Sequence, residues 1–159
     1  MESELVPIDS LILDRSNARK HDKKNLEAIK GSLARFGQQK PIVVGSDNVV
    51  IAGNGTLEAA RELGWTEIRV IRSELKGLDR TAFSLADNRT SELSFWNDEV
   101  LSETLKSLQD EFDLSEIGFD EIDLAKLLNM PDDKIKEKEL DDETITTDFE
   151  CPSCGYKWS

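Results

Sequence analysis

A buried strand, a glycine turn and a helix follow one another between residues 49 and 65. The run Val49–Ala52 consists of apolar residues and ends at a glycine, which indicates a buried strand. Apolar residues then recur at helical spacing before a closing glycine: Leu57, Ala60, Leu63 and Gly64. Residues 53–56, Gly-Asn-Gly-Thr, are therefore expected at a helix N-terminus that directly follows a buried strand.

This position suits an anion. The first backbone N–H groups of a helix have no partner within the helix, and the helix dipole is positive at that end. Glycine lets the backbone approach a phosphate without an intervening Cβ. We predict that Gly53, Asn54, Gly55 and Thr56 bind a phosphate group, with Thr56 either capping the helix or contacting the ligand. The dinucleotide and P-loop fingerprints do not fit these residues, and an ordinary glycine turn is the alternative.

The remaining pattern predicts a mixed α/β order that becomes helical in the second half. Strands are expected at residues 5–8, 41–44, 49–52 and 68–72, and further helices at residues 22–36, 78–93, 97–112 and 121–128. Asp22 is the expected cap of the first of these, and Gly37 its end. Its buried side should carry Leu26, Ile29, Leu33 and Phe36, and that of the helix at 97–112 should carry Val100, Leu101, Leu105, Leu108 and Phe112.

The charge of the chain is unevenly distributed. The formal net charge is −13, but residues 1–80 hold 13 Lys and Arg against 12 Asp and Glu (+1), whereas residues 81–159 hold 7 against 21 (−14). Lysine and arginine residues are concentrated in residues 15–40. We predict that this segment contacts nucleic-acid phosphates through Arg15, Lys20, Lys23 and Lys24. An ordinary solvated helix face is the alternative.

The end of the chain differs in composition. Residues 131–148 are charged and nearly free of large apolar side chains, which predicts an acidic linker. Residues 149–159 hold both cysteines, Cys151 and Cys154, spaced C-x-x-C before a glycine as in half of a Zn²⁺-binding knuckle. A second subunit or further residues would have to supply the other two ligands, because the only histidine, His21, is distant in sequence. A redox dithiol and two unreactive thiols are the alternatives.

The chain is expected to be cytoplasmic. Its 159 residues, 38% of them hydrophobic, suffice for one core, and no apolar stretch is long enough to cross a membrane. The N-terminus lacks the basic and apolar layout of a secretory signal.

Several ordered motifs in the first 130 residues resemble the ParB/sulfiredoxin superfamily. They are Asn17-Ala18-Arg19-Lys20-His21, the stretch from Ile29 to Val44, the glycine loop and Ala86-Asp87-Asn88-Arg89, followed by Trp96-Asn97-Asp98 and Ile117-Gly118-Phe119. The resemblance is strongest to ParB-like domains of phages, prophages and mobile elements, which are often fused to or encoded beside DNA methyltransferases. It implies an α+β fold at residues 1–95, with a small mixed sheet flanked by helices and the ligand site at the glycine loop. An acidic helical extension, residues 96–130, would follow.

The resemblance also implies ligands. Branches of the superfamily bind CTP or ATP, act on DNA, phosphorylate serine or reduce oxidised cysteine. Reduction of oxidised cysteine is not expected of this chain, because its glycine loop lacks the cysteine that the sulfiredoxin branch carries there. The loop also lacks the arginine or histidine that partition proteins and methyltransferase-linked relatives carry there. Arg19 and Arg89 are the expected charge partners of the phosphate, and Glu58 or Asp87 could hold Mg²⁺ or act as a base.

We therefore predict a ParB-like accessory protein of a phage or mobile-element DNA-handling system, which binds a nucleotide or nucleic-acid phosphate at Gly53–Thr56. A nucleotide-dependent phosphotransferase or nuclease is one alternative. An acidic adaptor that binds a protein partner is the other. A DNA methyltransferase or another phage protein is the expected partner, and the chain could form a homodimer.

Overall fold

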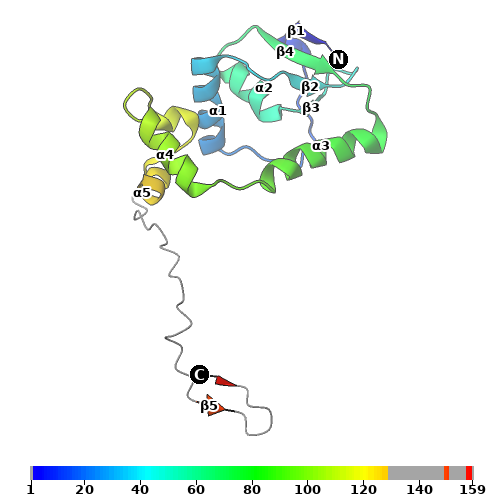
Figure 1. Cartoon of the computed structure of the whole chain (residues 1–159). Helices are drawn as coiled ribbons and strands as arrows, with labels where there is room; N and C mark the ends of the chain where they lie inside the picture. Colours follow the sequence, from blue (N-terminus) through cyan, green and yellow to red (C-terminus); the bar gives the residue numbers. More distant parts are fainter. Residues whose placement is uncertain (1, 129–148, 151–156, 159) are drawn as a thin grey trace. The chain divides into compact units, whose positions relative to one another are not determined.

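The structure is a computed structural model that describes residues 2–128, 149–150 and 157–158 (Figure 1). The chain divides into two compact units, Met1–Asn129 and Met130–Ser159. The elements of the first unit are β1 (Ser3–Pro7), η1 (Ile8–Ser10), α1 (Lys23–Phe36), β2 (Ile42–Val44), β3 (Val50–Ala52), α2 (Asn54–Glu62), β4 (Glu67–Arg72), α3 (Gly77–Glu92), α4 (Asp98–Leu108), η2 (Leu114–Ile117) and α5 (Glu121–Leu128).

The first unit is built on a four-stranded mixed sheet in the order β1-β4-β2-β3. The β1–β4 and β2–β3 pairs are antiparallel, and the central β2–β4 pair is parallel. Helices α1 and α2 pack against each other, and α3 runs beside β3 (Figure 1). The predicted α+β fold, with a small mixed sheet flanked by helices, is confirmed.

The core lies between the sheet and helices α1 and α2. Its fully buried members are the inward side chains of the strands and the apolar face of α2, including Val44, Val50, Leu57, Ile68 and Val70. Alternation along β4 shows the cause: Ile68 and Val70 are buried, whereas Glu67 and Arg69 are exposed. The strand–turn–helix segment is thus fixed from both sides by apolar packing.

The ends of α1 follow the sequence signals. The Asp22 carboxylate accepts a hydrogen bond from the backbone N–H of Asn25 at 2.8 Å, as an N-cap does. Gly37 ends the helix with φ at +67°, a conformation that favours glycine. The predicted helix at residues 97–112 instead ends at Leu108, and residues 114–117 form the short helix η2.

Two expected core residues are exposed. Phe36 is 43% exposed and Val100 is 58% exposed, so the prediction that both face the core is wrong. The ring of Phe36 lies at the last turn of α1, beside the guanidinium of Arg35, which is 6.0 Å from its centroid. Val100 lies in the first turn of α4, whose buried residues are Ser102 and Leu105.

The acidic extension packs against α1 rather than extending away from it. Helix η2 contacts α1, and the approach is so close that a Cβ on Gly31 would lie 2.7 Å from the carbonyl oxygen of Glu116. Ion pairs span the same contact: Lys24 Nζ lies 2.6 Å from Asp120 and 3.3 Å from Asp123, and Arg35 lies 3.2 Å from Glu116. Helix α1 thus joins the sheet to the extension.

The second unit is described only at two short strands. β5 (Phe149–Glu150) and β6 (Lys157–Trp158) pair antiparallel, with Phe149 opposite Trp158. The predicted linker at residues 131–148 and the predicted zinc ligands Cys151 and Cys154 lie outside the described residues. Among the helices that the structure describes, none has the length and apolar character needed to span a bilayer.

Candidate functional site

A glycine with positive φ connects β3 to α2. Gly53 has φ at +97° and ψ at 28°, in the left-handed region. A Cβ at this position would lie 2.5 Å from Cγ2 of Ile42, on the neighbouring strand. Backbone conformation and close packing therefore both require glycine here, and they direct the N-terminus of α2 to the edge of the sheet.

The first turn of α2 offers backbone donors. The helix begins at Asn54, and its first N–H to carbonyl bond runs from Leu57 to Gly53 at 3.0 Å. The N–H groups of Asn54, Gly55 and Thr56 precede that bond, and in the described part of the chain no side chain caps this end. Thr56 is therefore not the cap, since Gly53 holds the N-cap position.

The side chain of Asn54 has a structural role. It is 8% exposed, and its Oδ1 accepts a hydrogen bond from the backbone N–H of Asp14 at 3.0 Å. This bond ties the segment before α1 to the glycine loop. The contribution of Asn54 to a ligand would therefore come from its backbone N–H.

A pocket of about 240 Å³ lies at this helix end. Its walls come from the segment before α1, the start of α1, the β3–α2 junction and the C-terminal half of α3. The lining residues are Asn17, Arg19, His21, Asn25, Ile29, Ile51, Ala52, Gly53, Asn54, Gly55, Thr56, Asp87, Asn88 and Ser91. The structure thus brings together the predicted loop residues, Arg19 and Asp87.

Arg19 links the pocket to α3. Its Nη1 atom lies 3.4 Å from Oδ1 of Asn88 and 3.5 Å from a carboxylate oxygen of Glu92. The amide nitrogen of Asn88 donates to the carbonyl of Ser84 at 2.8 Å, which fixes the orientation of the amide. These contacts hold the guanidinium at the wall of the pocket.

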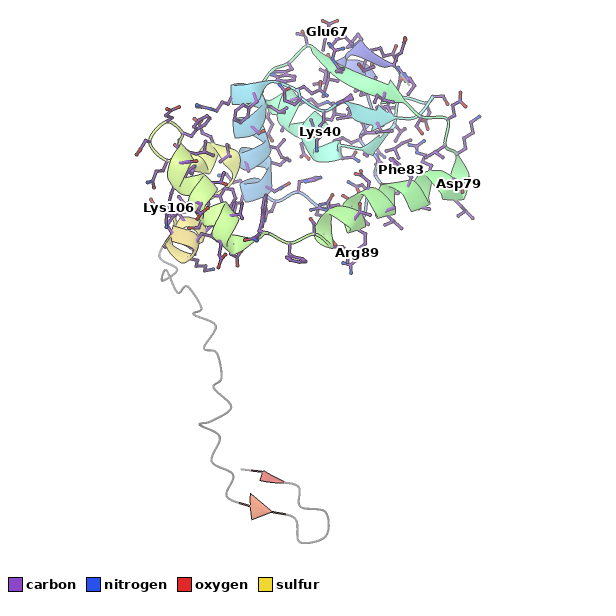
Figure 2. All side chains as sticks on the ribbon, in the orientation of Figure 1. Lys40, Glu67, Asp79, Phe83, Arg89 and Lys106 are labelled. Carbon is purple, nitrogen blue, oxygen red and sulfur yellow. The ribbon has the colours of Figure 1, made fainter. Side chains whose placement is uncertain are left out.

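Two other predicted site residues do not line the pocket. Arg89 is exposed and its guanidinium lies 3.3 Å from Glu92. Figure 2 shows Arg89 on the side of α3 opposite Phe83, which faces the sheet. Glu58 is half-buried on the second turn of α2, outside the lining. The roles of Glu58 and Arg89 stay predictions.

Residue-level prediction missed polar residues that line the pocket from α1, α3 and the segment before α1. They are Asn17, His21, Asn25, Asn88 and Ser91. Three of them belong to motifs that the sequence singles out, Asn17 and His21 in the first and Asn88 in the last, so position within a motif was the available signal. No such signal pointed to Asn25, because its proximity to His21 depends on the start of α1 at Lys23.

Within the described residues, the expected nucleic-acid surface contains both cations in an ion pair and cations with none. Arg15, Lys20 and Lys23 are exposed. Lys24 contacts Asp120 and Asp123, and its ammonium group holds the pKa of the Asp120 carboxyl well below its usual range, at about 2. The same hydrogen bonds raise the pKa of Lys24. Lys24 is therefore less available to DNA than its three neighbours.

Metal ligands are sparse in this part of the molecule. No group of three or more His, Cys, Asp and Glu side chains gathers around one point in residues 2–128. A magnesium ion bound here would need ligand oxygens from the nucleotide itself. Asp87 is the one predicted carboxylate that lines the pocket.

The ParB N-terminal domain family matches residues 1–89 of the sequence, which is more than half of the chain. The chain belongs to this family. The matched segment includes all four strands of the sheet, the glycine loop and the whole Asp87-Asn88-Arg89 motif. No curated protein matches the sequence.

One solved structure supports the ParB-like fold, and two more resemble it less closely. The C-terminally truncated chromosome-partitioning protein ParB from Caulobacter crescentus, complexed with CTP-γ-S, is 20% identical with a TM-score of 0.67, and the match covers 80% of this chain and 77% of that one. The same protein complexed to the centromeric parS site matches at 20% identity and a TM-score of 0.47, over 78% of this chain and 63% of that one. Sulfiredoxin from Arabidopsis thaliana matches at 21% identity and a TM-score of 0.43, over 54% of this chain and 98% of that one.

Proposed function

We propose that this ParB-family chain binds a nucleoside triphosphate, with its phosphates at the N-terminus of α2. The pocket supports this proposal most directly, because residues 54–56, whose backbone N–H groups have no partner in the described part of the chain, line it together with Arg19 and Asn88. The Caulobacter ParB complexed with CTP-γ-S makes CTP the first nucleotide to test and ATP the second.

Calorimetric titration with CTP and ATP in the presence of Mg²⁺ tests this proposal. Gly55→Val should abolish binding, because Gly55 is buried and any Cβ there meets the ring of His21 at 2.7–2.9 Å. Ala34→Val is the matched control, since Ala34 is exposed on α1 and adds similar bulk away from the pocket. Equal binding by Gly55→Val and the wild type would show that the nucleotide binds elsewhere.

The biological setting that we propose is DNA handling in a phage or mobile element, with a DNA methyltransferase or another phage protein as partner. DNA contact would use the exposed cations Arg15, Lys20 and Lys23. Reversing Lys20 and Lys23 to Glu should weaken retention on a duplex and lower the salt slope by about 2, because each lost phosphate contact removes about 0.9 of slope. Lys106→Glu on α4 is the control, and an unchanged salt slope would exclude this surface.

A second candidate is an enzyme that transfers or hydrolyses phosphate, and the position of Asp87 favours it. Asp87 is a carboxylate in the pocket wall, where it could orient a nucleophile or hold Mg²⁺ against the phosphates. Asp87→Asn should then abolish turnover of the bound nucleotide and leave its affinity within a few-fold. Turnover that survives in Asp87→Asn would remove this assignment.

A further inference from the structure

The glycine loop contributes no charged side chain to its own pocket. Residues 53–56 supply backbone N–H groups, an amide that is bonded to Asp14, and a hydroxyl. Arg19 is shared with Asn88 and Glu92. A second cationic group facing the loop would stabilise a bound phosphate further.

His21 occupies the matching position. A Cβ built on Gly55 would lie 2.7 Å from Cε1, 2.8 Å from Nδ1 and 2.9 Å from Nε2 of its imidazole. Three ring atoms at nearly equal distance mean that the face of the ring, and not its edge, lies against the first turn of α2. The ring is half-buried and lines the pocket, so Gly55 is the residue that lets it approach the helix N-terminus.

Asn25 fixes the orientation of the ring. Nδ1 of His21 lies 2.6 Å from Oδ1 of Asn25, one turn further along the chain. With an amide oxygen as its partner, Nδ1 carries a hydrogen and donates it. The nitrogen that remains for a ligand is Nε2, which in a neutral ring is an acceptor. A phosphate oxygen is also an acceptor, so the two can bond only when Nε2 is protonated.

We propose that His21 contacts the phosphate of the bound nucleotide and takes up a proton at Nε2 when the nucleotide binds, an inference that rests on the proposed nucleotide site. One proton passes from a buffer acid or hydronium to Nε2, so that the bond to the donor breaks and the Nε2–H bond forms, and Nε2 then donates a hydrogen bond to a phosphate oxygen. Two charged side chains share the pocket with the ring: Asp87 from α3 and Arg19 from the segment before α1. Asp22, the next residue, is exposed.

Proton uptake is measurable separately from affinity. The enthalpy of CTP binding at pH 8, titrated in buffers of different ionisation enthalpy, gives the number of protons taken up from the slope. For the wild type we expect an uptake of up to about one proton per nucleotide. His21→Gln keeps a side chain that can hydrogen-bond but cannot be protonated, and it should lose that uptake and about tenfold to a hundredfold in affinity. Lys106→Ala removes a cation from α4, far along the chain from the pocket motifs, and should match the wild type.

A double-mutant cycle tests the contact with Gly55. Gly55→Ala should weaken CTP binding in the wild-type background, because the new Cβ displaces the ring. In the His21→Ala background the same substitution should cost much less, since no ring remains to displace. Circular dichroism of each variant confirms that it is folded.

Failure of the nucleotide site and failure of the role of His21 would give different results. Absence of CTP and ATP binding by the wild type would overturn the nucleotide site and this inference together. Binding without proton uptake by the wild type would overturn the role of His21 and leave the nucleotide site intact, whatever His21→Gln does to stability. The role of His21 would also be overturned if His21→Gln bound CTP with the same affinity and the same proton uptake as the wild type.

Discussion

At the scale of single residues, the site depends on two glycines with different physical roles. Gly53 is required by backbone conformation and by its contact with Ile42, whereas Gly55 is required only by the side chain packed over it. The sequence pattern predicted both as permissive for a ligand. The structure shows that a neighbouring side chain already fills the space that a Cβ would take at each position. That neighbour is Ile42 of β2 at Gly53 and the imidazole of His21 at Gly55.

Gly53→Ala should lower the free energy of unfolding by more than the cost of placing alanine in the left-handed conformation. The left-handed conformation costs alanine about 1–2 kcal/mol, and the contact of the new Cβ with Ile42 adds to that cost. Chemical denaturation of the variant measures the sum. Gly64→Ala is the matched control, because φ is +75° there and nothing lies within 4 Å of the new Cβ. If both variants lose the same free energy of unfolding, the contact with Ile42 contributes nothing.

At the scale of elements, α1 is the connection between the pocket and the acidic extension. One end of the helix positions Asn25 beside the pocket, while Gly31, Lys24 and Arg35 contact the segment from Glu116 to Asp123. Local signals predicted the bounds of α1 correctly, because a capping aspartate and a closing glycine act within one turn. The Lys24–Asp120 pair spans 96 positions, so no local pattern could reveal it.

Gly31→Ala should separate α1 from η2. The new Cβ would lie 2.7 Å from the Glu116 carbonyl oxygen, which is backbone and cannot rotate away. We expect a loss of about 1–3 kcal/mol from overpacking, reduced by the roughly 1 kcal/mol that alanine gains over glycine inside a helix. Thermal unfolding with the exposed Ser32→Ala as control measures the difference. A variant more stable than the wild type would contradict the close approach.

The Lys24–Asp120 contact should weaken as the pH falls from about 4 to about 2. Folding lowers the pKa of Asp120 from 3.8 to about 2, so the stabilisation is present above the unfolded value and is lost as the pH falls through the folded one. Titration of the Asp120 carboxyl by NMR measures this directly. Lys24→Met should raise the midpoint toward 3.8, and Lys23→Met should leave it unchanged. A midpoint that is the same in the wild type and in Lys24→Met would exclude the contact in solution.

At the scale of the whole molecule, the sequence predicted the order of elements far better than the faces they bury. Ile68 and Val70 of β4 and Leu57 and Ala60 of α2 are buried, whereas Leu63, at the end of the same helical stripe, is 37% exposed. Helix α3 is different: none of its residues is buried in the described chain. Its exposed apolar side chains are consistent with the predicted homodimer, whose interface would not be visible in one chain.

The predicted homodimer should depend on the exposed apolar side chains of α3 and of residues 93–96, which follow it. Leu78 is 87% exposed and Phe95 is 94% exposed, with Leu85, Leu93 and Trp96 exposed between or beside them. We expect Phe95→Ser combined with Trp96→Ser to shift sedimentation of the chain toward the monomer, with or without CTP. Leu5→Ser, on the exposed side of β1, is the control for lost apolar surface elsewhere. Sedimentation of the wild type as a monomer under all these conditions would contradict the dimer.

Nucleotide phosphates should bind at the first turn of α2. The most direct measurement is a backbone amide NMR titration of the wild type with CTP and with ATP in the presence of Mg²⁺. We predict that the largest shifts fall on the N–H groups of Asn54, Gly55 and Thr56, with smaller shifts at Arg19 and Asn88. Amides that do not move at millimolar nucleotide, or that move only outside this pocket, would contradict the account.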